Sequence, residues 1–191
     1  NETYHSRHGA LTESDYVYIN KGLSYWLENN NINEVNIFEM GLGTGLNAYL
    51  SYIYSLEHQL SINYVSIEKF PLNKNEIENL KLKDILPEAQ YHNFFDQLHN
   101  SKWNLIHKVS DFSFHKIKGD FFGMKLGQNF DVLFYDAFGY LAQSEMWEKK
   151  ALKICFNLLK TEGIWVSYCA KGQVRRDLEK VGFSVERLEG P

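Results

Sequence analysis

The chain has 191 residues, which suits one domain with a full hydrophobic core. Its formal net charge of −4 argues against indiscriminate binding to nucleic acids, although a local basic patch could still serve a structured RNA. No apolar run approaches the roughly 18 residues of a membrane span and no signal peptide is visible, so we expect a cytoplasmic protein that does not enter membranes. The two cysteines, Cys155 and Cys169, belong to no ligand cluster, so we expect buried free thiols and no metal.

In chain order, the first predicted elements are an irregular arm over residues 1–20 and a helix over 22–29. Runs of apolar and β-branched residues then predict strands over residues 35–40, 62–67, 130–135, 164–169 and 183–188. Helical spacing and helix-start signals predict helices over residues 45–56, 72–80, 145–159 and 172–181, with Pro87 as the candidate start of another. A short polar break between residues 103–109 and 112–117 predicts a hairpin.

The alternation of strands and helices predicts an α/β fold, with a mostly parallel, doubly wound sheet and helices on both of its faces. We expect a single domain over residues 1–191. In it, an N-terminal arm and helix (1–30) precede a Rossmann-type core (35–191).

A glycine-rich turn follows the strand predicted over 35–40. Positions 39–47 read Glu-Met-Gly-Leu-Gly-Thr-Gly-Leu-Asn, and Gly41, Gly43 and Gly45 let the backbone adopt positive φ and let a ligand approach closely. At the carboxyl end of the first strand of an α/β sheet, such a turn is where nucleotide-like cofactors bind. The same spacing also fits a tight connection that binds nothing.

Two acidic residues discriminate between cofactors. Glu68 ends the next predicted strand about 20 residues past the glycines, where a carboxylate accepts hydrogen bonds from ribose hydroxyls. Glu39 directly precedes the turn, where a carboxylate would repel a pyrophosphate and would suit a positively charged cofactor. Because S-adenosylmethionine carries a sulfonium and an amino group, it fits these acids better than NAD does.

Several motifs together resemble one family. They are residues 39–47, Glu-Lys-Phe-Pro-Leu over 68–72, Gly119-Asp120, Tyr-Asp-Ala-Phe over 135–138 with Glu145-Met146-Trp147, Val174-Arg175-Arg176 and, near the start, Tyr4 to Ser6, Gly9 and Glu13 to Val17. In this order they cover almost the whole chain, and it resembles the methyltransferase domain of the MnmC family of tRNA 5-methylaminomethyl-2-thiouridine methyltransferases. The motif over 68–72 is more specific than the glycine turn.

The resemblance implies a Rossmann-type enzyme that transfers the methyl group of S-adenosylmethionine to the aminomethyl group on the wobble uridine of certain tRNAs. It implies tRNA as a partner, and a separate tRNA-modifying enzyme that supplies the aminomethyl group as a further candidate partner. Two-domain members of the family also carry a flavin-dependent oxidoreductase domain. This chain has no second glycine fingerprint, so we expect a stand-alone form without flavin chemistry.

The resemblance also assigns cofactor-binding roles. Glu39 and the glycine backbone, with Asn47 at the end of the same motif, would hold the methionine part of S-adenosylmethionine, and Glu68 would bind the ribose diol. These residues all lie near the predicted carboxyl ends of strands, where an α/β sheet binds its ligands.

Further residues are candidates for contacts with the rest of the cofactor. Lys69 and Phe70 could flank the adenine, and Asp120 would accept a hydrogen bond from the adenine amino group. A structural aspartate in a turn explains Asp120 equally well. On the resemblance alone, Ser6, with Tyr4 beside it, could close over the cofactor from the N-terminal arm.

Asp136 is the predicted catalytic residue. It follows the most hydrophobic predicted strand, at the sheet edge where ligands bind, and it could orient the substrate amine and accept its proton. A helix N-cap or a backbone turn is its alternative role. Phe138 and Tyr140 could stack on a flipped-out uracil, although aromatic residues at this spacing, Trp147 included, are also typical of a core.

A basic stretch is the predicted contact for RNA phosphates. Lys171, Arg175 and Arg176 open the helix predicted over 172–181, and Lys180 and Arg187 follow them. A solvated helix face has the same pattern.

Two departures from the family pattern concern the substrate side and the end of the chain. The family usually has Asp-Gly-Phe followed by a small residue and proline, whereas residues 136–140 here are Asp-Ala-Phe-Gly-Tyr, which changes the rim of the predicted substrate pocket. The family also continues into a final antiparallel strand, which we expect to be missing from this chain because the sequence stops at Gly190-Pro191.

Other functions stay open at this point. A small-molecule amine methyltransferase or aminopropyltransferase shares the fold and the acid at position 136. A nonenzymatic S-adenosylmethionine-binding partner of a tRNA-modifying protein would bind the cofactor without turnover. An NAD-dependent oxidoreductase is disfavoured by the position of Glu39 ahead of the turn.

Overall fold

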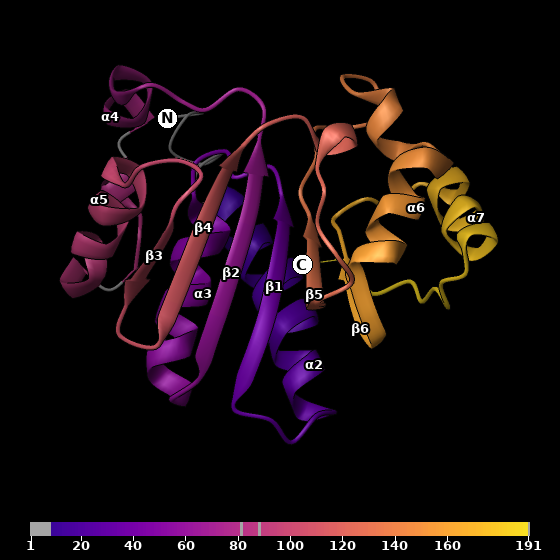
Figure 1. The fold of residues 1–191 in the computed structure, drawn as a ribbon, viewed down its shortest axis with the longest axis horizontal. Helices are drawn as coiled ribbons and strands as arrows, with labels where there is room; N and C mark the ends of the chain where they lie inside the picture. Colours follow the sequence, from indigo (N-terminus) through magenta and orange to yellow (C-terminus); the bar gives the residue numbers. More distant parts are fainter. Residues whose placement is uncertain (1–8, 81, 88, 191) are drawn as a thin grey trace.

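A six-stranded sheet forms the centre of the computed structural model, which describes residues 9–80, 82–87 and 89–190 (Figure 1). The strands lie in the order β3-β4-β2-β1-β5-β6. In chain order they are β1 (Glu34–Met40), β2 (Ser61–Glu68), β3 (Ile106–Val109), β4 (Phe112–Lys118), β5 (Phe130–Tyr135) and β6 (Leu159–Val166). Neighbouring strands are parallel except β3 and β4, which form the predicted antiparallel hairpin. The prediction of a mostly parallel α/β sheet is confirmed.

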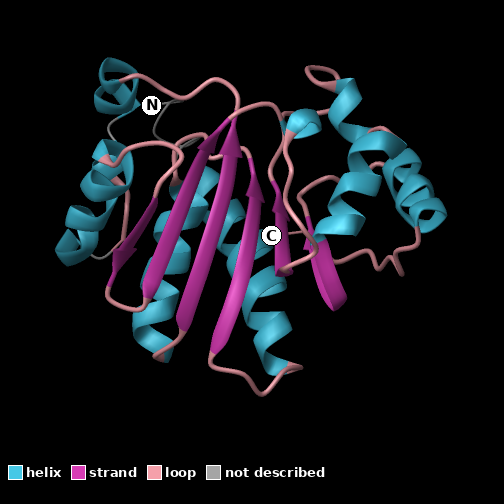
Figure 2. Cartoon of the chain, viewed as in Figure 1, coloured by secondary structure: helices cyan, strands magenta, loops and turns pink. Residues whose placement is uncertain are grey.

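Helices cover both faces of the sheet (Figure 2). One face carries η1 (Asp15–Ser24), α2 (Tyr25–Glu28), α3 (Leu46–His58) and α5 (His92–Asn100), and the other carries α6 (Lys149–Leu158) and α7 (Gly172–Val181). Helix α4 (Lys74–Leu80) lies above α5 at the β3 side of the sheet in Figure 1. Short 3₁₀ turns occur at η2 (Leu82–Asp84), η3 (Ala89–Tyr91), η4 (Phe121–Gly123) and η5 (Ser144–Trp147).

The two faces have separate hydrophobic cores, because successive side chains of a strand point to opposite faces. In β1, Ile37 belongs to the core under α3, whereas Phe38 belongs to the core under α6. Glu39 therefore lies on the same face as Ile37, toward α3 and η1, and this alternation decides which side chains can reach it.

The N-terminal segment differs from its prediction. Residues 9–28 are helical, whereas we expected an irregular arm up to residue 20. The middle part, η1, is a π-helix, a conformation that often occurs at functional sites. Its wide turns bury Val17 and Tyr18 together, so a run of consecutive apolar residues without helical spacing still forms a helix. Gly22 permits close packing on the sheet, since a Cβ there would lie 3.0 Å from Val166 Cγ1.

The C-terminal part also differs from its prediction. Helix α6 begins at Lys149 rather than 145, β6 spans Leu159–Val166 rather than 164–169, and residues 183–188 form no strand. The ring of Phe183 instead packs against Phe156 of α6, with 5.2 Å between the ring centroids. The alternation that predicted a strand therefore serves packing against a helix.

The two cysteines lie in different environments. Cys155 is buried in α6, and Cys169 is half-buried beyond the end of β6 rather than within a strand. No helix within the described ranges is long and apolar enough to cross a membrane.

The turn between β1 and α3 holds its glycines in left-handed conformations, with φ of +85° at Gly41, +50° at Gly43 and +76° at Gly45. Gly45 precedes α3, and a Cβ there would lie 2.8 Å from Leu98 Cδ2 of α5. At Gly43 a Cβ would meet no atom within 4 Å. The turn is therefore packed against α5 at Gly45 and open at Gly43.

This difference predicts unequal effects of alanine at the two glycines. Gly43→Ala should lower the free energy of unfolding by about 1–2 kcal/mol through left-handed backbone strain alone. Gly45→Ala should cost about 1–3 kcal/mol more, because the new methyl group overpacks the contact with α5. Urea unfolding of both variants measures the difference, and equal losses would contradict the packing of α5 against the turn.

Candidate active site

Three acidic residues meet at the carboxyl edge of the parallel strands. Glu39 is the penultimate residue of β1, Glu68 is the last residue of β2 and Asp136 directly follows β5. Because parallel strands end at the same edge of a sheet, these residues surround the glycine turn. The structure thus brings the predicted cofactor acids and the predicted catalytic acid together.

The side-chain amide of Asn47 links two of these acids. Asn47 is the second residue of α3 and is only 2% exposed. Its Nδ2 donates to Glu39 Oε1 and to Asp136 Oδ2, both at 3.0 Å. A single amide group therefore holds the acid before the glycine turn and the acid after β5 in fixed relative positions.

A tyrosine from the N-terminal helix binds the other oxygen of Asp136. The hydroxyl of Tyr18, in η1, donates to Asp136 Oδ1 at 2.8 Å. Tyr18 is 1% exposed, and its ring packs against Phe134 of β5 with 5.3 Å between centroids. Asp136 as a residue is exposed, but its carboxylate thus points inward and accepts a hydrogen bond at each oxygen.

Burial dominates the electrostatics of this acid pair. Burial raises the pKa of Glu39 well above its ordinary value, and the charge of Asp136 raises it further. Burial also raises the pKa of Asp136, while hydrogen bonds from Tyr18 and Asn47 oppose that rise. The site therefore holds two carboxyl groups whose protons are bound more tightly than those of exposed acids.

Glu68 is bonded to the glycine turn. Its Oε2 accepts from the backbone N–H of Gly43 at 3.2 Å, and its Oε1 accepts from the N–H of Phe70 at 2.8 Å. The half-buried carboxylate consequently lies directly beside the open position at Gly43. This is the location in which a carboxylate can bind a ribose diol.

The candidate adenine contacts lie at the surface. Lys69 Nζ pairs with Asp120 Oδ2 at 2.6 Å, and Asp120 Oδ1 accepts from the N–H of Phe122 at 2.8 Å, capping η4. The hydrogen bond from Lys69, followed by that from Phe122, lowers the pKa of Asp120. Asp120 therefore has the turn role that the sequence left open, and its contact with adenine stays a prediction. The predicted adenine neighbour Phe70 is 73% exposed.

The loop after β5 presents aromatic groups on an anchored backbone. Trp147 Nε1 donates to the carbonyl of Phe138 at 2.8 Å, and the hydroxyl of Tyr168 donates to the carbonyl of Ala137 at 2.7 Å. The side chain of Phe138 is nevertheless 73% exposed. Trp147, by contrast, is buried and belongs to the core, as the alternative interpretation of its spacing predicted.

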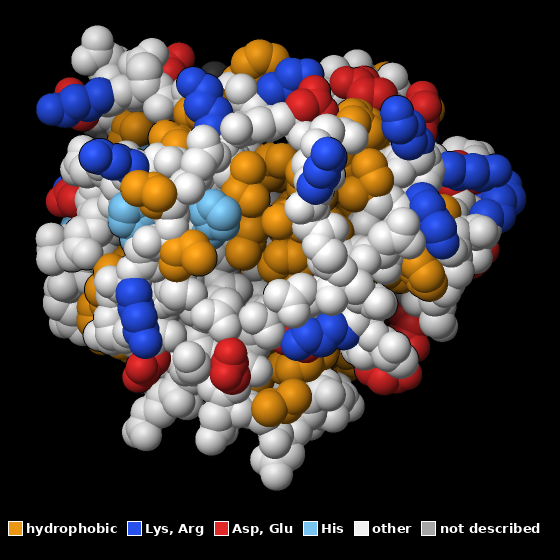
Figure 3. All heavy atoms as spheres, in the orientation of Figure 1, with side chains coloured by type: hydrophobic (Ala, Val, Ile, Leu, Met, Phe, Trp, Pro, Cys, Tyr) orange, Lys and Arg blue, Asp and Glu red, His pale blue; other side chains and the backbone are white. Residues whose placement is uncertain are grey.

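The predicted basic stretch lies next to this loop. Lys171 precedes α7, and its Nζ lies 3.2 Å from the centroid of the Tyr140 ring. Arg175 and Arg176 are exposed on the first turns of the same helix. In Figure 3, Lys and Arg side chains gather over the region of α6 and α7. Tyr140 and the candidate phosphate contacts Lys171, Arg175 and Arg176 therefore lie together beside the loop after β5, and we call this surface the rim.

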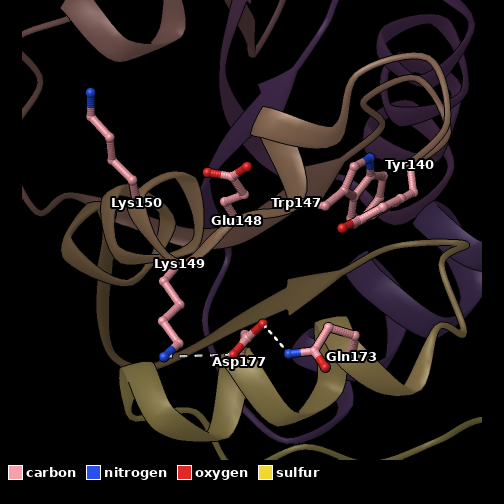
Figure 4. Close-up of a pocket in the computed structure, with 7 residues that line it drawn as sticks. All are labelled: Tyr140, Trp147, Glu148, Lys149, Lys150, Gln173 and Asp177. Atoms are coloured by element: carbon pink, nitrogen blue, oxygen red, sulfur yellow. Dashed lines mark hydrogen bonds and ion pairs between the residues drawn. The ribbon is translucent and has the colours of Figure 1, made fainter.

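A hollow of about 290 Å³ opens on the same rim and not at the glycine turn (Figure 4). Its lining consists of Tyr140 and Trp147 together with Glu148, Lys149, Lys150, Gln173 and Asp177. The carboxylate of Asp177 accepts a hydrogen bond from Gln173 Nε2 at 2.6 Å and lies 3.9 Å from Lys149 Nζ. The acidic group of the hollow is therefore already paired with neighbouring side chains. Lys150 points away from the other lining residues in Figure 4.

Helix α5 supports the back of the glycine turn. His99 Nε2 lies 3.0 Å from the carbonyl oxygen of Thr44, which makes this nitrogen the donor. Burial lowers the pKa of His99 to about 4, so the ring is neutral at physiological pH. Lys116, buried in β4, donates to the carbonyls of Leu98 and Ser101 at the end of α5. The turn is thus fixed from behind by a helix whose own end is held by a buried cation.

The buried polar atoms around Glu39 test which ligand the turn could hold. Among the described residues, none donates a hydrogen bond of normal geometry to Glu39 Oε2. The hydroxyls of Tyr64 and Ser66 also make no hydrogen bond of normal geometry. Both hydroxyls are nevertheless near enough to Glu39 to lower its pKa. A buried carboxylate oxygen without a donor is costly, so a donor such as an amino group or a water molecule is expected there. With the open backbone at Gly43, these groups fit S-adenosylmethionine. No cluster that could hold a metal ion occurs in the described part of the chain.

Comparison with known proteins identifies the family. Residues 88–191 match the family described as S-adenosyl-L-methionine-dependent methyltransferase. The chain belongs to this family. Its methyltransferase cofactor is S-adenosylmethionine, as the acids around the turn predicted.

Individual relatives match this chain over part of their own length. The bifunctional proteins MnmC of tRNA 5-methylaminomethyl-2-thiouridine biosynthesis from Leptospira borgpetersenii and Burkholderia thailandensis are 28% and 24% identical to this methyltransferase over 202 and 203 residues. Each alignment covers 99% of this chain and 30% of the relative, so the chain spans under a third of their length. The crystal structure of MNMC2 from Aquifex aeolicus superposes with a TM-score of 0.74 and 23% identity, covering 92% of this chain and 55% of that one.

Some residues of this methyltransferase site were missed by sequence reasoning, and one prediction lies outside the structure. The sequence placed Tyr18 in the irregular N-terminal arm, and no sequence pattern indicated a role for His99. Tyr64 and Ser66 were detectable in principle, because they alternate along β2 and Ser66 pairs in register with Glu39. Ser6 lies outside the described residues, so its proposed contact with the cofactor stays a prediction.

The position of Glu68 predicts a role in cofactor affinity. Glu68→Ala should weaken S-adenosylmethionine binding by about 1–3 kcal/mol, the cost of losing a charged hydrogen-bond acceptor. Isothermal titration calorimetry measures the affinity, with Glu57→Ala, an exposed acid on α3, as the matched control. If Glu68→Ala and the control bind equally well, the ribose assignment is wrong.

The neutral His99 predicts an acid-sensitive fold. Its pKa is lower in the folded chain than in the unfolded chain, so the unfolded chain binds the extra proton first as the pH falls below about 6.5. The contribution of neutral His99 to stability is fully present above pH 6.5, and the free energy of unfolding should fall by about 2–3 kcal/mol as the pH approaches 4.

Urea unfolding at intervals between pH 7 and pH 4 measures this loss. His99→Asn should flatten the pH dependence, whereas His58→Asn, at an exposed position on α3, should leave it unchanged. Identical profiles for the three proteins would show that His99 does not cause the acid sensitivity.

Proposed function

We propose that the protein methylates the aminomethyl nitrogen of 5-aminomethyluridine, 2-thiolated or not, at the wobble position of tRNA. Membership of the methyltransferase family supports the methyl donor. The relatives named for tRNA 5-methylaminomethyl-2-thiouridine biosynthesis support the substrate class. The motif over residues 68–72, which resembles those enzymes, points to the same substrate.

The observation that carries the proposal is the shared amide of Asn47. It places the acid beside the cofactor turn and the acid after β5 within hydrogen-bond reach of one nitrogen atom. Bound S-adenosylmethionine supplies an electrophilic methyl group on a positively charged sulfur. An amine held at Asp136 would then lie next to the methyl-donor end of the site, as an in-line displacement requires.

Asp136 would also manage the proton of the substrate. An alkylamine attacks only when its nitrogen is neutral, so an ammonium must first give up one proton. Burial of its carboxyl group raises the pKa of Asp136 above the ordinary aspartate value, which makes its carboxylate a stronger base than that of an ordinary aspartate. Its oxygens already accept bonds from Tyr18 and Asn47, and each oxygen keeps a further lone pair for the amine.

The rim beside Asp136 would bind the nucleic acid. The exposed ring of Phe138 and the half-buried ring of Tyr140 are available for stacking on an extruded base. Lys171, Arg175 and Arg176 would contact phosphates, and the contact between Lys171 and Tyr140 keeps a cation beside the stacking surface. Tyr140, which stands where the family pattern has proline, lies on this rim, so the contacts to the base would differ from those of the family pattern.

Two further parts of the proposal follow from the substrate. The aminomethyl group must be installed before it is methylated, so a separate tRNA-modifying enzyme is the proposed supplier. Because the substrate is tRNA, the proposed location of the reaction is the cytoplasm.

The experiment that tests the function is transfer of a radiolabelled methyl group from S-adenosylmethionine to tRNA from cells that lack this protein, followed by nucleoside analysis. We expect label in methylaminomethyluridine, and none with tRNA from cells that contain the protein, where the position is already methylated. Failure to label any tRNA, with cofactor binding intact by calorimetry, would contradict the proposal. It would favour a small-molecule amine methyl- or aminopropyltransferase, or a binding partner without turnover.

The proposed base predicts a specific kinetic defect. Asp136→Asn should retain the fold and bind S-adenosylmethionine within a few-fold of the wild type, but slow methyl transfer by about 10²–10⁴-fold, the usual contribution of a positioned base. Single-turnover transfer measures the rate, with Asp111→Asn, an exposed acid in the β3–β4 turn, as the control. Near-wild-type turnover of Asp136→Asn would remove Asp136 from the mechanism.

A further inference from the structure

Tyr18 reaches the proposed active site from an element outside the Rossmann core. It lies in η1, 118 positions before Asp136 in the sequence. Its hydroxyl bonds Asp136 Oδ1 at 2.8 Å and lies 3.4 Å from the carbonyl oxygen of Tyr135. The carboxylate is therefore the better partner of the two. A tyrosine used only to fill the core would not need this contact, because its ring already packs against Phe134.

The two donors on Asp136 act on different oxygens. Tyr18 binds Oδ1 from η1, and Asn47 binds Oδ2 from α3. Two fixed donors on opposite oxygens determine the orientation of the carboxylate plane, which one donor alone would leave free to rotate. Both donors are almost fully buried, so their own positions are set by packing.

We infer that Tyr18 is a positioning residue for methyl transfer, whose hydroxyl fixes the Asp136 carboxylate against α3 so that its free lone pairs face the substrate amine. The inference rests on the proposed role of Asp136 as the base. Tyr18 itself does not contact the substrate and neither gains nor loses a proton in the reaction.

The charged and titratable groups that face Asp136 determine how the loss of this hydroxyl would act. They come from four packed elements: Glu39 of β1, Tyr64 of β2, Tyr18 of η1 and Tyr168 after β6. Burial raises the pKa of Asp136, and the hydrogen bond from Tyr18 lowers it. Without the hydroxyl, the pKa of Asp136 rises further, so a higher pH is needed to obtain the carboxylate that acts as the base.

The test is Tyr18→Phe, which retains the ring against Phe134 and removes only the hydroxyl. We expect kcat to fall about 10- to 100-fold, as for loss of a hydrogen bond to a charged group, with the KM for tRNA and the Kd for S-adenosylmethionine within about twofold of wild type. The acidic limb of the pH–rate profile should move to higher pH. A merely structural role would lower stability without moving this limb.

A matched control and a double variant separate positioning from general damage. Tyr49→Phe removes another buried tyrosine hydroxyl, which bonds the carbonyl of Pro87 at 2.7 Å, and it should leave kcat and the pH profile unchanged. If Tyr18 acts through Asp136, the variant that combines Tyr18→Phe with Asp136→Asn should be no slower than Asp136→Asn alone. Additive losses would overturn the inference.

A measurement without substrate keeps this inference separate from the proposed function. The ¹³C signal of the Asp136 carboxyl, assigned by its absence in Asp136→Asn, should titrate at higher pH in Tyr18→Phe than in the wild type. If no tRNA is methylated by the wild type, the proposed function fails while this shift still shows that Tyr18 controls Asp136. If the wild type is active and Tyr18→Phe changes neither the titration nor kcat, the role of Tyr18 is refuted.

Discussion

The amide of Asn47, bonded at 3.0 Å to one carboxyl oxygen of Glu39 and to one of Asp136, is the interaction on which the rest of the site depends. Burial raises the pKa of both Glu39 and Asp136, and the charge of Asp136 raises that of Glu39 further, so the arrangement is unfavourable unless hydrogen-bond donors offset the burial. Asn47 can supply both bonds only because α3 begins immediately after the glycine turn. The left-handed backbone of that turn and the support of α5 behind it are therefore requirements of the chemistry as well as of the fold.

The N-terminal helix completes the acid pair from outside the Rossmann core. Its π-helical segment buries Tyr18 against β5, and Gly22 lets the segment approach β6 closely enough to do so. The N-terminal helix thus contributes a polar side chain to one side of the site, and the carboxyl ends of the parallel strands contribute the acids. This division explains why the N-terminal segment is helical and tightly packed, although its apolar residues lack ordinary helical spacing.

The proposed substrate side of the site differs in burial and charge from the proposed cofactor side. Around Glu39 the polar groups are buried, whereas the loop after β5 exposes Phe138 on a backbone held by Trp147 and Tyr168. The cationic side chain of Lys171, which directly precedes α7, lies beside that loop, although the chain as a whole carries a net charge of −4. Local clustering of charge rather than the total would therefore decide where the proposed RNA substrate binds.

The sequence by itself determined the α/β fold, the glycine turn, the acids at positions 39, 68 and 136 and the cofactor, because strand alternation and turn chemistry are local properties and parallel strands bring their carboxyl ends to one edge. It did not determine that residues 183–188 form no strand and that Phe183 packs on α6, since an apolar ring can be buried equally well in a sheet or against a helix. Only the tertiary structure decided that Tyr18 and Asn47 bind opposite oxygens of Asp136 and that His99 supports the turn. Those contacts join segments tens of residues apart, and their geometry depends on helix packing that no local pattern encodes.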